Sequence, residues 1–156
     1  MSFSIVNQPR FGLKGRAAAG WLVARGIEIP QQPNTWLALQ NQGRILRLGR
    51  GEFLVEGELA VTLSVVWQDG QPDLYRVPRY DFGCVLSGEA IPALLQEICA
   101  LDTRAHSMGD QVLMTQAAGI SVTLLCETHT DAPVYRLWCD ATYGDYMHET
   151  LQHILN

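Results

Sequence analysis

Apolar and polar positions alternate in short runs along much of the chain, and this pattern predicts a series of short strands. The runs are rich in apolar and β-branched residues and are bounded by Gly, Asn or Pro, as is typical of antiparallel strands joined by tight turns. The predicted strands are 36–39, 44–48, 52–56, 74–77, 82–86, 111–117, 120–126 and 134–139. Tight turns are expected at 41–43, 49–51 and 118–119.

Apolar residues at helical spacing predict helices between these strands. The predicted helices cover residues 15–26, 59–66, 92–101 and 143–155. Residues 27–34 contain two prolines and are expected to form an extended connection.

One segment occurs twice in similar form, because residues 11–22 return as residues 84–95. Each copy reads as a strand that ends in Leu-x-Gly, at Gly15 or Gly88, followed by a helix. The residues expected on the apolar faces of these helices are Ala17, Trp21, Ala90 and Leu94. A duplicated strand-to-helix unit indicates a domain of two similar halves.

The order strand, helix, hairpin, strand, helix occurs in both halves and predicts an α+β fold. In such a fold the helices pack on antiparallel or mixed sheets. The length of 156 residues fits a single domain, 1–156. The clearest internal break, at residues 69–73, divides it into halves of about 1–69 and 70–156.

The composition is sparse in charge. Apolar residues make up 47% and charged residues 17%, with a net charge of −5. This low charge leaves two alternatives, a tightly folded monomer or a surface partly covered by a partner. The basic residues are scattered, so no nucleic-acid-binding surface is expected.

The cysteines Cys84, Cys99, Cys126 and Cys139 are isolated and lack the spacing of metal ligands or redox pairs. Residues 1–10 lack the features of a signal peptide, and no apolar run reaches the roughly 20 residues of a membrane-spanning helix. We therefore expect a cytoplasmic protein with reduced, buried thiols and no membrane association.

Asp102, His106 and Asp110 recur at intervals of four residues and could form an acid–base or metal cluster. The favoured interpretation is a solvated loop, because residues 107–109 break any continued helix. Near the C-terminus, His148 and His153 flank Glu149. The histidines are five positions apart, so they point about 140° apart on a helix, and a polar face is expected rather than a zinc site.

The glycines at 43, 49 and 51 resemble a phosphate-binding loop only superficially, and turns between strands explain them better. No serine stands in a nucleophile-elbow context. The serines considered are Ser64, Ser87, Ser107 and Ser121.

Aromatic and arginine residues interleave over residues 75–81, a composition enriched at protein interfaces. An exposed edge strand protected by Pro78 is an equally good explanation. Both interpretations stay open.

Short motifs occur in order over nearly the whole chain. These are Arg10-Phe11-Gly12-Leu13-Lys14-Gly15 with Trp21-Leu22, Gly26-Ile27, Pro30 to Trp36, Arg47-Leu48-Gly49 with Glu52-Phe53-Leu54-Val55, Leu86-Ser87-Gly88, Cys99-Ala100-Leu101-Asp102, Thr115-Gln116, Tyr135-Arg136-Leu137-Trp138 and Tyr143-Gly144-Asp145-Tyr146. The ordered set resembles the gamma-subunit family of heterotetrameric sarcosine oxidase. That family resembles the folate-binding fold of the glycine-cleavage aminomethyltransferase, so the resemblance implies duplicated ferredoxin-like halves.

The resemblance also implies a non-catalytic structural subunit with no catalytic, cofactor-binding or metal-binding residues of its own. FAD, FMN, NAD and tetrahydrofolate would be bound by alpha- and beta-like partner subunits, and zinc by a delta subunit. The complex would demethylate sarcosine oxidatively to glycine and pass the one-carbon unit to tetrahydrofolate. The low charge, the scattered arginines and the tryptophans at 21, 36, 67 and 138 motivate this scaffold role.

Two alternatives remain. The first is a stand-alone folate-binding or one-carbon transfer protein, for which no pterin-binding carboxylate can be assigned from the sequence. The second is a self-associating adaptor, a homo-oligomer without the other subunits.

Overall fold

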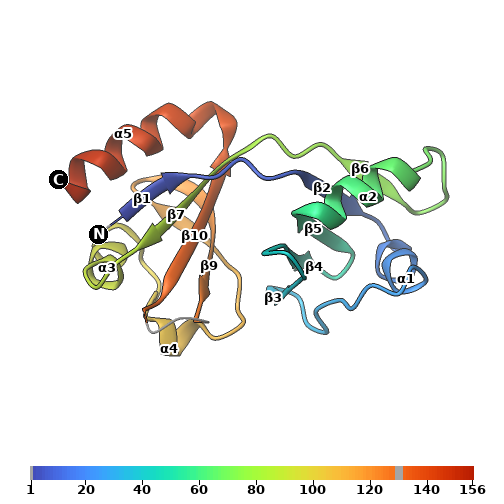
Figure 1. Cartoon of the computed structure of the whole chain (residues 1–156), viewed down its shortest axis with the longest axis horizontal. Coiled ribbons are helices and arrows are strands. Elements are labelled where there is room, and N and C mark those ends of the chain that lie inside the picture. The colour runs from blue at the N-terminus through green and yellow to red at the C-terminus, as the bar shows by residue number, and fades with distance from the viewer. Residues whose placement is uncertain (1, 129–131) are drawn as a thin grey trace. The chain divides into compact units, whose positions relative to one another are not determined.

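The computed structural model describes residues 2–128 and 132–156. Contacts between residues divide the chain into two compact units. The first unit is Gln8–Arg79, and the second is Met1–Asn7 together with Tyr80–Asn156. Each unit contains one five-stranded sheet with helices packed on it (Figure 1), and every strand pair within the described residues is antiparallel. The α+β prediction is therefore confirmed.

The division between the units differs from the predicted halves 1–69 and 70–156. The strand β6 (Tyr75–Val77) pairs with β2 (Arg10–Lys14) and so belongs to the first unit. At the other end, β1 (Ser2–Ile5) pairs with β7 (Asp81–Ser87) of the second unit. The break at 69–73 is a loop inside the first unit, since strand pairing rather than loop composition sets the boundary.

The first unit has the sheet order β3-β4-β5-β2-β6. Its further elements are α1 (Ala18–Val23), β3 (Thr35–Ala38), β4 (Arg44–Gly49), β5 (Glu52–Glu56) and α2 (Glu58–Val66). The turn before β4 places Asn41 and Gln42 at positive φ, as a tight hairpin requires. Both helices contribute to one core, where the rings of Phe11, Trp21 and Trp67 contact one another at centroid distances of 5.6–6.0 Å.

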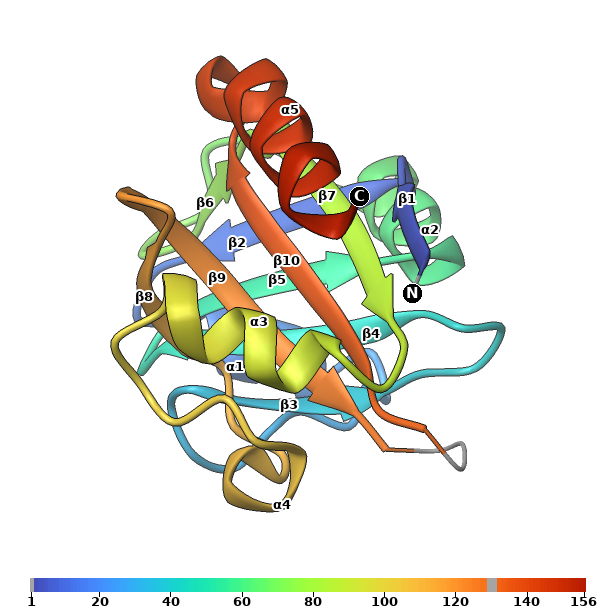
Figure 2. The same cartoon turned by 90° about the vertical axis from the view of Figure 1, so that its left-hand side faces the viewer.

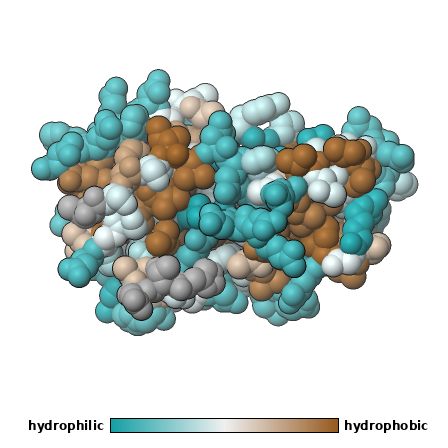
Figure 3. Space-filling view, in the orientation of Figure 1, coloured by the Kyte–Doolittle hydropathy of each residue, from teal (hydrophilic) through white to brown (hydrophobic). Residues whose placement is uncertain are grey.

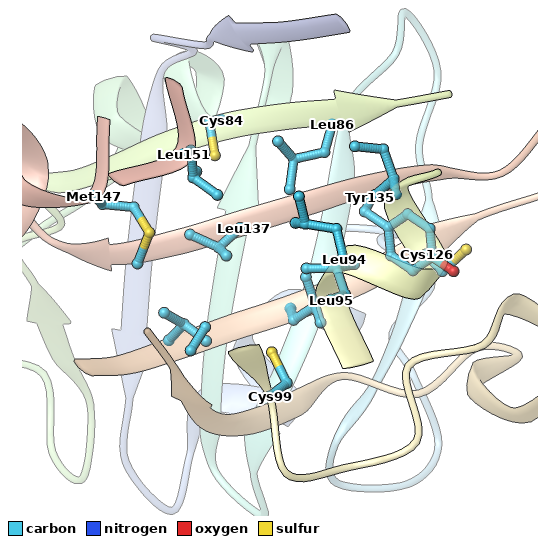
Figure 4. Packing of buried hydrophobic residues seen from close by; sticks show 14 of the residues in the cluster. Cys84, Leu86, Leu94, Leu95, Cys99, Cys126, Tyr135, Leu137, Met147 and Leu151 are labelled. Carbon is cyan, nitrogen blue, oxygen red and sulfur yellow. The ribbon is translucent and has the colours of Figure 1, made fainter. Parts of the chain in front are cut away.

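The second unit has the sheet order β1-β7-β10-β9-β8. Its further elements are α3 (Ile91–Ile98), α4 (Ala105–Met108), β8 (Leu113–Ala117), β9 (Ile120–Glu127), β10 (Val134–Asp140), a 3₁₀ turn (Ala141–Tyr143) and α5 (Gly144–Leu155). Figure 2 shows α3 and α5 on the same face of this sheet. In the core, Leu94 and Leu95 of α3 and Met147 and Leu151 of α5 pack with sheet residues such as Leu137 (Figure 4).

The repeated segment adopts the same turn in both units. Gly15 and Gly88 have φ values of 133° and 129°, and their carbonyls accept hydrogen bonds from Ala18 (3.1 Å) and Ile91 (3.2 Å), where α1 and α3 begin. The two sheet orders also correspond when the first is read in reverse, as β6-β2-β5-β4-β3, and set beside β1-β7-β10-β9-β8. In this correspondence β2 matches β7, and β1 occupies the position that β6 holds in the first unit.

The predicted strands and helices are all present, with differences at their ends. The first helix is shorter than 15–26, because residues 15–17 form the turn that leaves the strand. Ala17 and Ala90 are exposed residues that precede the helices, so the buried faces begin instead at Ala18 and Ile91. Three elements were not predicted: the strand β1, the short helix α4 in a region expected to be a loop, and the 3₁₀ turn Ala141–Tyr143.

Candidate functional site

The acidic stretch around α4 does not form a catalytic or metal cluster in the structure. Asp102, His106 and Asp110 are all exposed. The Asp102 carboxylate accepts hydrogen bonds from the backbone N–H and the guanidinium of Arg104, at 2.7–3.0 Å. These bonds hold the pKa of Asp102 well below its usual range. The carboxylate is therefore engaged at the start of α4 and is not a free ligand.

The C-terminal histidines lie apart on α5. His148 is half-buried and its ring lies 5.4 Å from the ring of Phe3, whereas Glu149 and His153 are exposed. Within residues 2–128 and 132–156, no group of three His, Cys, Asp or Glu side chains is placed to hold a metal ion. The polar-face interpretation of this helix agrees with that placement.

The glycine-rich turn at residues 49–51 packs against the turn at Gly15, which leads into the short helix α1. The Gly15 N–H donates to the Gly51 carbonyl at 2.9 Å, and a Cβ on Gly51 would overlap the backbone of Gly15. A shallow hollow here is lined by Lys14, Gly15, Arg16 and residues 49–52. Lys14 faces Glu52 at 4.0 Å and Arg16 pairs with Asp73 at 2.9 Å. The glycines serve close backbone packing, as the turn interpretation expects.

Two of the four serines, Ser64 and Ser87, take part in structural hydrogen bonds. The Ser64 hydroxyl donates to the Ala60 carbonyl at 2.8 Å and accepts from Arg76 at 3.0 Å. The Ser2 and Ser87 hydroxyls lie 2.5 Å apart. Ser107 is exposed on α4, and Ser121 lies on β9.

The interleaved segment 75–81 contains the edge strand β6. Tyr75 and Tyr80 are 62% and 80% exposed. Arg76 lies over the Phe11 ring at 5.3 Å and so fastens the strand to the core of the first unit. The edge-strand interpretation is confirmed, and the interface interpretation stays a prediction.

The tryptophans are mostly core residues. Trp21, Trp36 and Trp138 are at most 8% exposed. These three rings therefore expose little surface.

All four cysteines are buried and free, and all belong to the core of the second unit. Burial raises the pKa of Cys84 to about 12, with a contribution from the nearby Cys139, and burial raises that of Cys139 to about 11. The Tyr135 hydroxyl lies beside the Cys126 sulfur (Figure 4) and donates to the Thr103 carbonyl at 2.8 Å. Thiols held in this protonated state are poor nucleophiles, so they are packing residues.

A buried ion-pair cluster lies on the first unit. The Glu56 carboxylate accepts from the guanidinium of Arg10 at 2.9 Å and from that of Arg44 at 2.5 Å. Arg44 also donates to the Gln8 side chain at 3.0 Å and to the Gln42 carbonyl at 2.8 Å. Glu56 and Arg44 are each 1% exposed. The guanidiniums and the carboxylate satisfy one another here, so the cluster fixes the strands β2, β4 and β5 rather than presenting a reactive group.

A hollow of about 570 Å³ on the second unit is the site that sequence reasoning missed. Asp81 of β7 and Asp140 of β10 line it and are paired neighbours in the sheet. The Asp140 carboxylate accepts from the hydroxyl (2.7 Å) and the N–H (2.9 Å) of Thr142, which lowers its pKa. Trp138 also lines the hollow but is only 3% exposed. The strand pairing that joins the two carboxylates could not be read from the sequence.

This hollow can accept hydrogen bonds from a ligand, and it holds no nucleophile–base pair. Its cysteine, Cys139, keeps its proton, and its hydroxyls come from Thr115, Ser121 and Thr123. A ring that stacks on an aromatic face is not accommodated, because Trp138 is covered. The hollow is therefore a weak candidate for a pterin site.

None of the helices within the described parts of the chain combines the length and apolar character needed to cross a membrane.

Comparisons with known proteins identify a shared fold. A chain of the heterotetrameric sarcosine oxidase from Corynebacterium sp. U-96, determined in complex with pyrrole 2-carboxylate, aligns with a TM-score of 0.68 and 20% sequence identity. The alignment covers 92% of this chain and 77% of that chain. No protein-family model and no curated protein sequence matches. At this identity the likeness establishes the fold, and it does not by itself transfer the activity.

Proposed function

We propose that this chain is a non-catalytic structural subunit of a heterotetrameric complex that resembles sarcosine oxidase. The observation that carries the proposal is the fold shared with a chain of that enzyme over 92% of this chain. The ordered motifs that resemble the gamma-subunit family support the same assignment. The complex would demethylate sarcosine oxidatively, with FAD, FMN, NAD, tetrahydrofolate and zinc bound by its other subunits.

The positions of the motif residues support a scaffold role. Gly12 lies where a Cβ would overlap the Val77 carbonyl, and Trp21 and Phe53 belong to the core of the first unit. Leu137 belongs to the core of the second unit. Residues that carry the resemblance thus hold strands and helices together, rather than converging on a ligand.

We further propose that both units derive from one ferredoxin-like β-α-β-β-α-β unit. The order β6-β2-β5-β4 in the first unit corresponds to β1-β7-β10-β9 in the second, and each sheet adds one edge strand, β3 or β8. The nearly equal φ values of Gly15 and Gly88 support a duplication that kept its first turn.

The test is assembly with the products of neighbouring genes. The chain is co-expressed with the proteins encoded by the genes on either side of its own, and the mixture is analysed by size-exclusion chromatography and native mass spectrometry. We expect one species that contains this chain in fixed stoichiometry. Elution of the chain apart from every co-expressed subunit would overturn the proposal.

The alternative, a stand-alone folate-binding protein, is favoured only by the paired carboxylates Asp81 and Asp140 in the hollow of the second unit. Calorimetric titration of the isolated chain with tetrahydrofolate separates the two functions. Binding that is lost in Asp81→Asn would support the alternative, and the absence of heat together with an unchanged melting temperature would remove it.

A further inference from the structure

The helices of the two units differ in what they present to solvent. On the second unit, the exposed positions of α3 and α5 include Gln96, Glu97, Asp145, Glu149 and Gln152. On α2 of the first unit, the exposed positions after the first turn are Val61, Thr62, Val65 and Val66. Figure 3 shows hydrophobic residues gathered over α2. The exposed residues of α3 and α5 are thus mostly polar, with Tyr146 an exception, whereas most of those on α2 are valines.

Val61 and Val65 lie one turn apart on α2 and form a surface that we call the valine face, and they are 50% and 79% exposed. Valine is a poor helix former because its branched side chain loses rotamer freedom against the preceding turn. An exposed valine gains no burial to offset this loss. Two exposed valines side by side on one short helix leave an apolar surface that a partner can cover.

A hollow of about 470 Å³ adjoins the valine face, since Leu59 and Thr62 of α2 contribute to its lining. The rest of the lining comes from residues 25–28 and 39–41, together with Glu58. It contains two carboxylates, those of Glu28 and Glu58, against one guanidinium.

The charges in this hollow favour a cation. Arg25, just after α1, donates to the Trp21 carbonyl at 3.0 Å and stacks 3.7 Å above the Trp21 ring, so its guanidinium is engaged by Trp21. Glu58 accepts one hydrogen bond from Asn41 at 2.5 Å. Glu28 is exposed and forms no ion pair within the described residues. A lysine or arginine entering the hollow would therefore find two carboxylate acceptors.

We propose that the valine face and the adjoining hollow dock a segment of a partner subunit that is apolar along one side and ends in a lysine or arginine. The apolar side covers the valine face, and the cation pairs with Glu28 and Glu58. This inference rests on the proposed function, because it assigns the surface through which the subunit joins its complex.

A second copy of this chain is a poorer fit for the same surface. The two ends of α2 both bring carboxylates, Glu58 in the first turn and Asp69 just beyond the last, where Asp69 accepts from the Trp67 indole at 2.7 Å. A copy that paired its valine face with this one would therefore offer carboxylates, rather than a cation, at the hollow. Charge complementarity favours a different chain.

The test uses the complete co-expressed complex and two variants with matched controls. The double variant Val61→Gln/Val65→Gln replaces the two valines with glutamine, which is polar and a good helix former. Its control, Ala93→Gln, introduces glutamine at an exposed position of α3. Glu28→Lys reverses a charge in the hollow, and Glu97→Lys is its exposed control on α3. We expect both test variants to weaken assembly by about tenfold or more and both controls to leave it unchanged.

Further measurements separate the outcomes. The melting temperature of each isolated variant should equal or exceed that of the wild type, which excludes misfolding as the cause. Normal assembly of both test variants would overturn the docking surface while leaving the proposed function intact. A wild type that joins no partner would overturn both. Dimers of the isolated chain in light scattering, lost in Val61→Gln/Val65→Gln, would identify a second copy as the occupant and overturn the assignment to a partner subunit.

Discussion

The turn at Gly15 makes a sharp prediction for the substitution Gly15→Ala. The residue has a φ of 133°, a conformation that L side chains rarely adopt, and a Cβ there would overlap the backbone carbonyl of Asp73. The backbone strain costs about 1–3 kcal/mol. The loop at Asp73 cannot yield freely, because its carbonyl accepts from the Ala17 N–H at 3.0 Å. Loss of that bond adds about 1 kcal/mol, for a total of about 2–4 kcal/mol.

Gly20→Ala is the matched control on the following helix. Gly20 lies in α1 with no atom within 4 Å of a built Cβ, so alanine fits and should stabilise the helix by about 1 kcal/mol. The same substitution five residues apart should therefore have opposite signs. Gly88→Ala repeats the strained change in the second unit, where φ is 129°.

The assay is urea unfolding of the purified variants, followed by circular dichroism and tryptophan fluorescence. Where the units unfold in separate transitions, Gly15→Ala should lower the midpoint of the first unit and Gly88→Ala that of the second. A Gly15→Ala protein as stable as the wild type would refute the argument from φ and backbone overlap. So would a destabilised Gly20→Ala protein.

Two further predictions concern buried charges and thiols. Glu56→Gln should lower the free energy of unfolding by about 3–5 kcal/mol, because it leaves the buried Arg44 guanidinium without its carboxylate partner. The control Glu52→Gln removes the 4.0 Å surface pair between Lys14 and Glu52 and should change the free energy of unfolding by less than about 1 kcal/mol. Equal effects of the two substitutions in urea unfolding would contradict this account. Burial raises the pKa of Cys84 from 9.0 to about 12, so the folded state holds the thiol proton more tightly than the unfolded state does. The resulting contribution to the free energy of unfolding is complete below pH 9 and is lost as the pH rises from 9 to 12. Unfolding measured between pH 8 and 11 should show that decline, with a smaller slope in Cys84→Ala; a flat profile for the wild type would argue against it.

Local sequence patterns predicted most of the secondary structure because the relevant forces act over a few residues. The hairpin turn at Asn41 and Gln42 and the break at Gly26 appear as expected. The helix α2 forms in spite of its β-branched residues, because Leu63 and Ala60 are buried against the sheet.

Features that depend on pairing between distant strands could not be predicted. The strand β1 alternates serines with Phe3 and Ile5, but it has only four residues, too few to establish a pattern, and it is held as a strand by its pairing with β7. The unit boundary and the neighbouring carboxylates Asp81 and Asp140 likewise follow from strand registers that the sequence does not encode locally. The exposure of the valine face could not be predicted, because apolar residues on a helix are ordinarily expected to be buried. The structure shows that α2 buries Ala60 and Leu63 instead.

The place of β1 in the second sheet has a consequence for the order in which the chain folds during synthesis. Ser2 pairs with Ser87, so β1 must wait for its partner until β7 emerges from the ribosome. Meanwhile residues 8–79 contain every strand of the first sheet and can complete it. The first unit should thus fold while its N-terminal extension is still unpaired, and the second unit closes its sheet last, over a long loop. Deletion of β1 is therefore expected to disturb the second unit rather than the first.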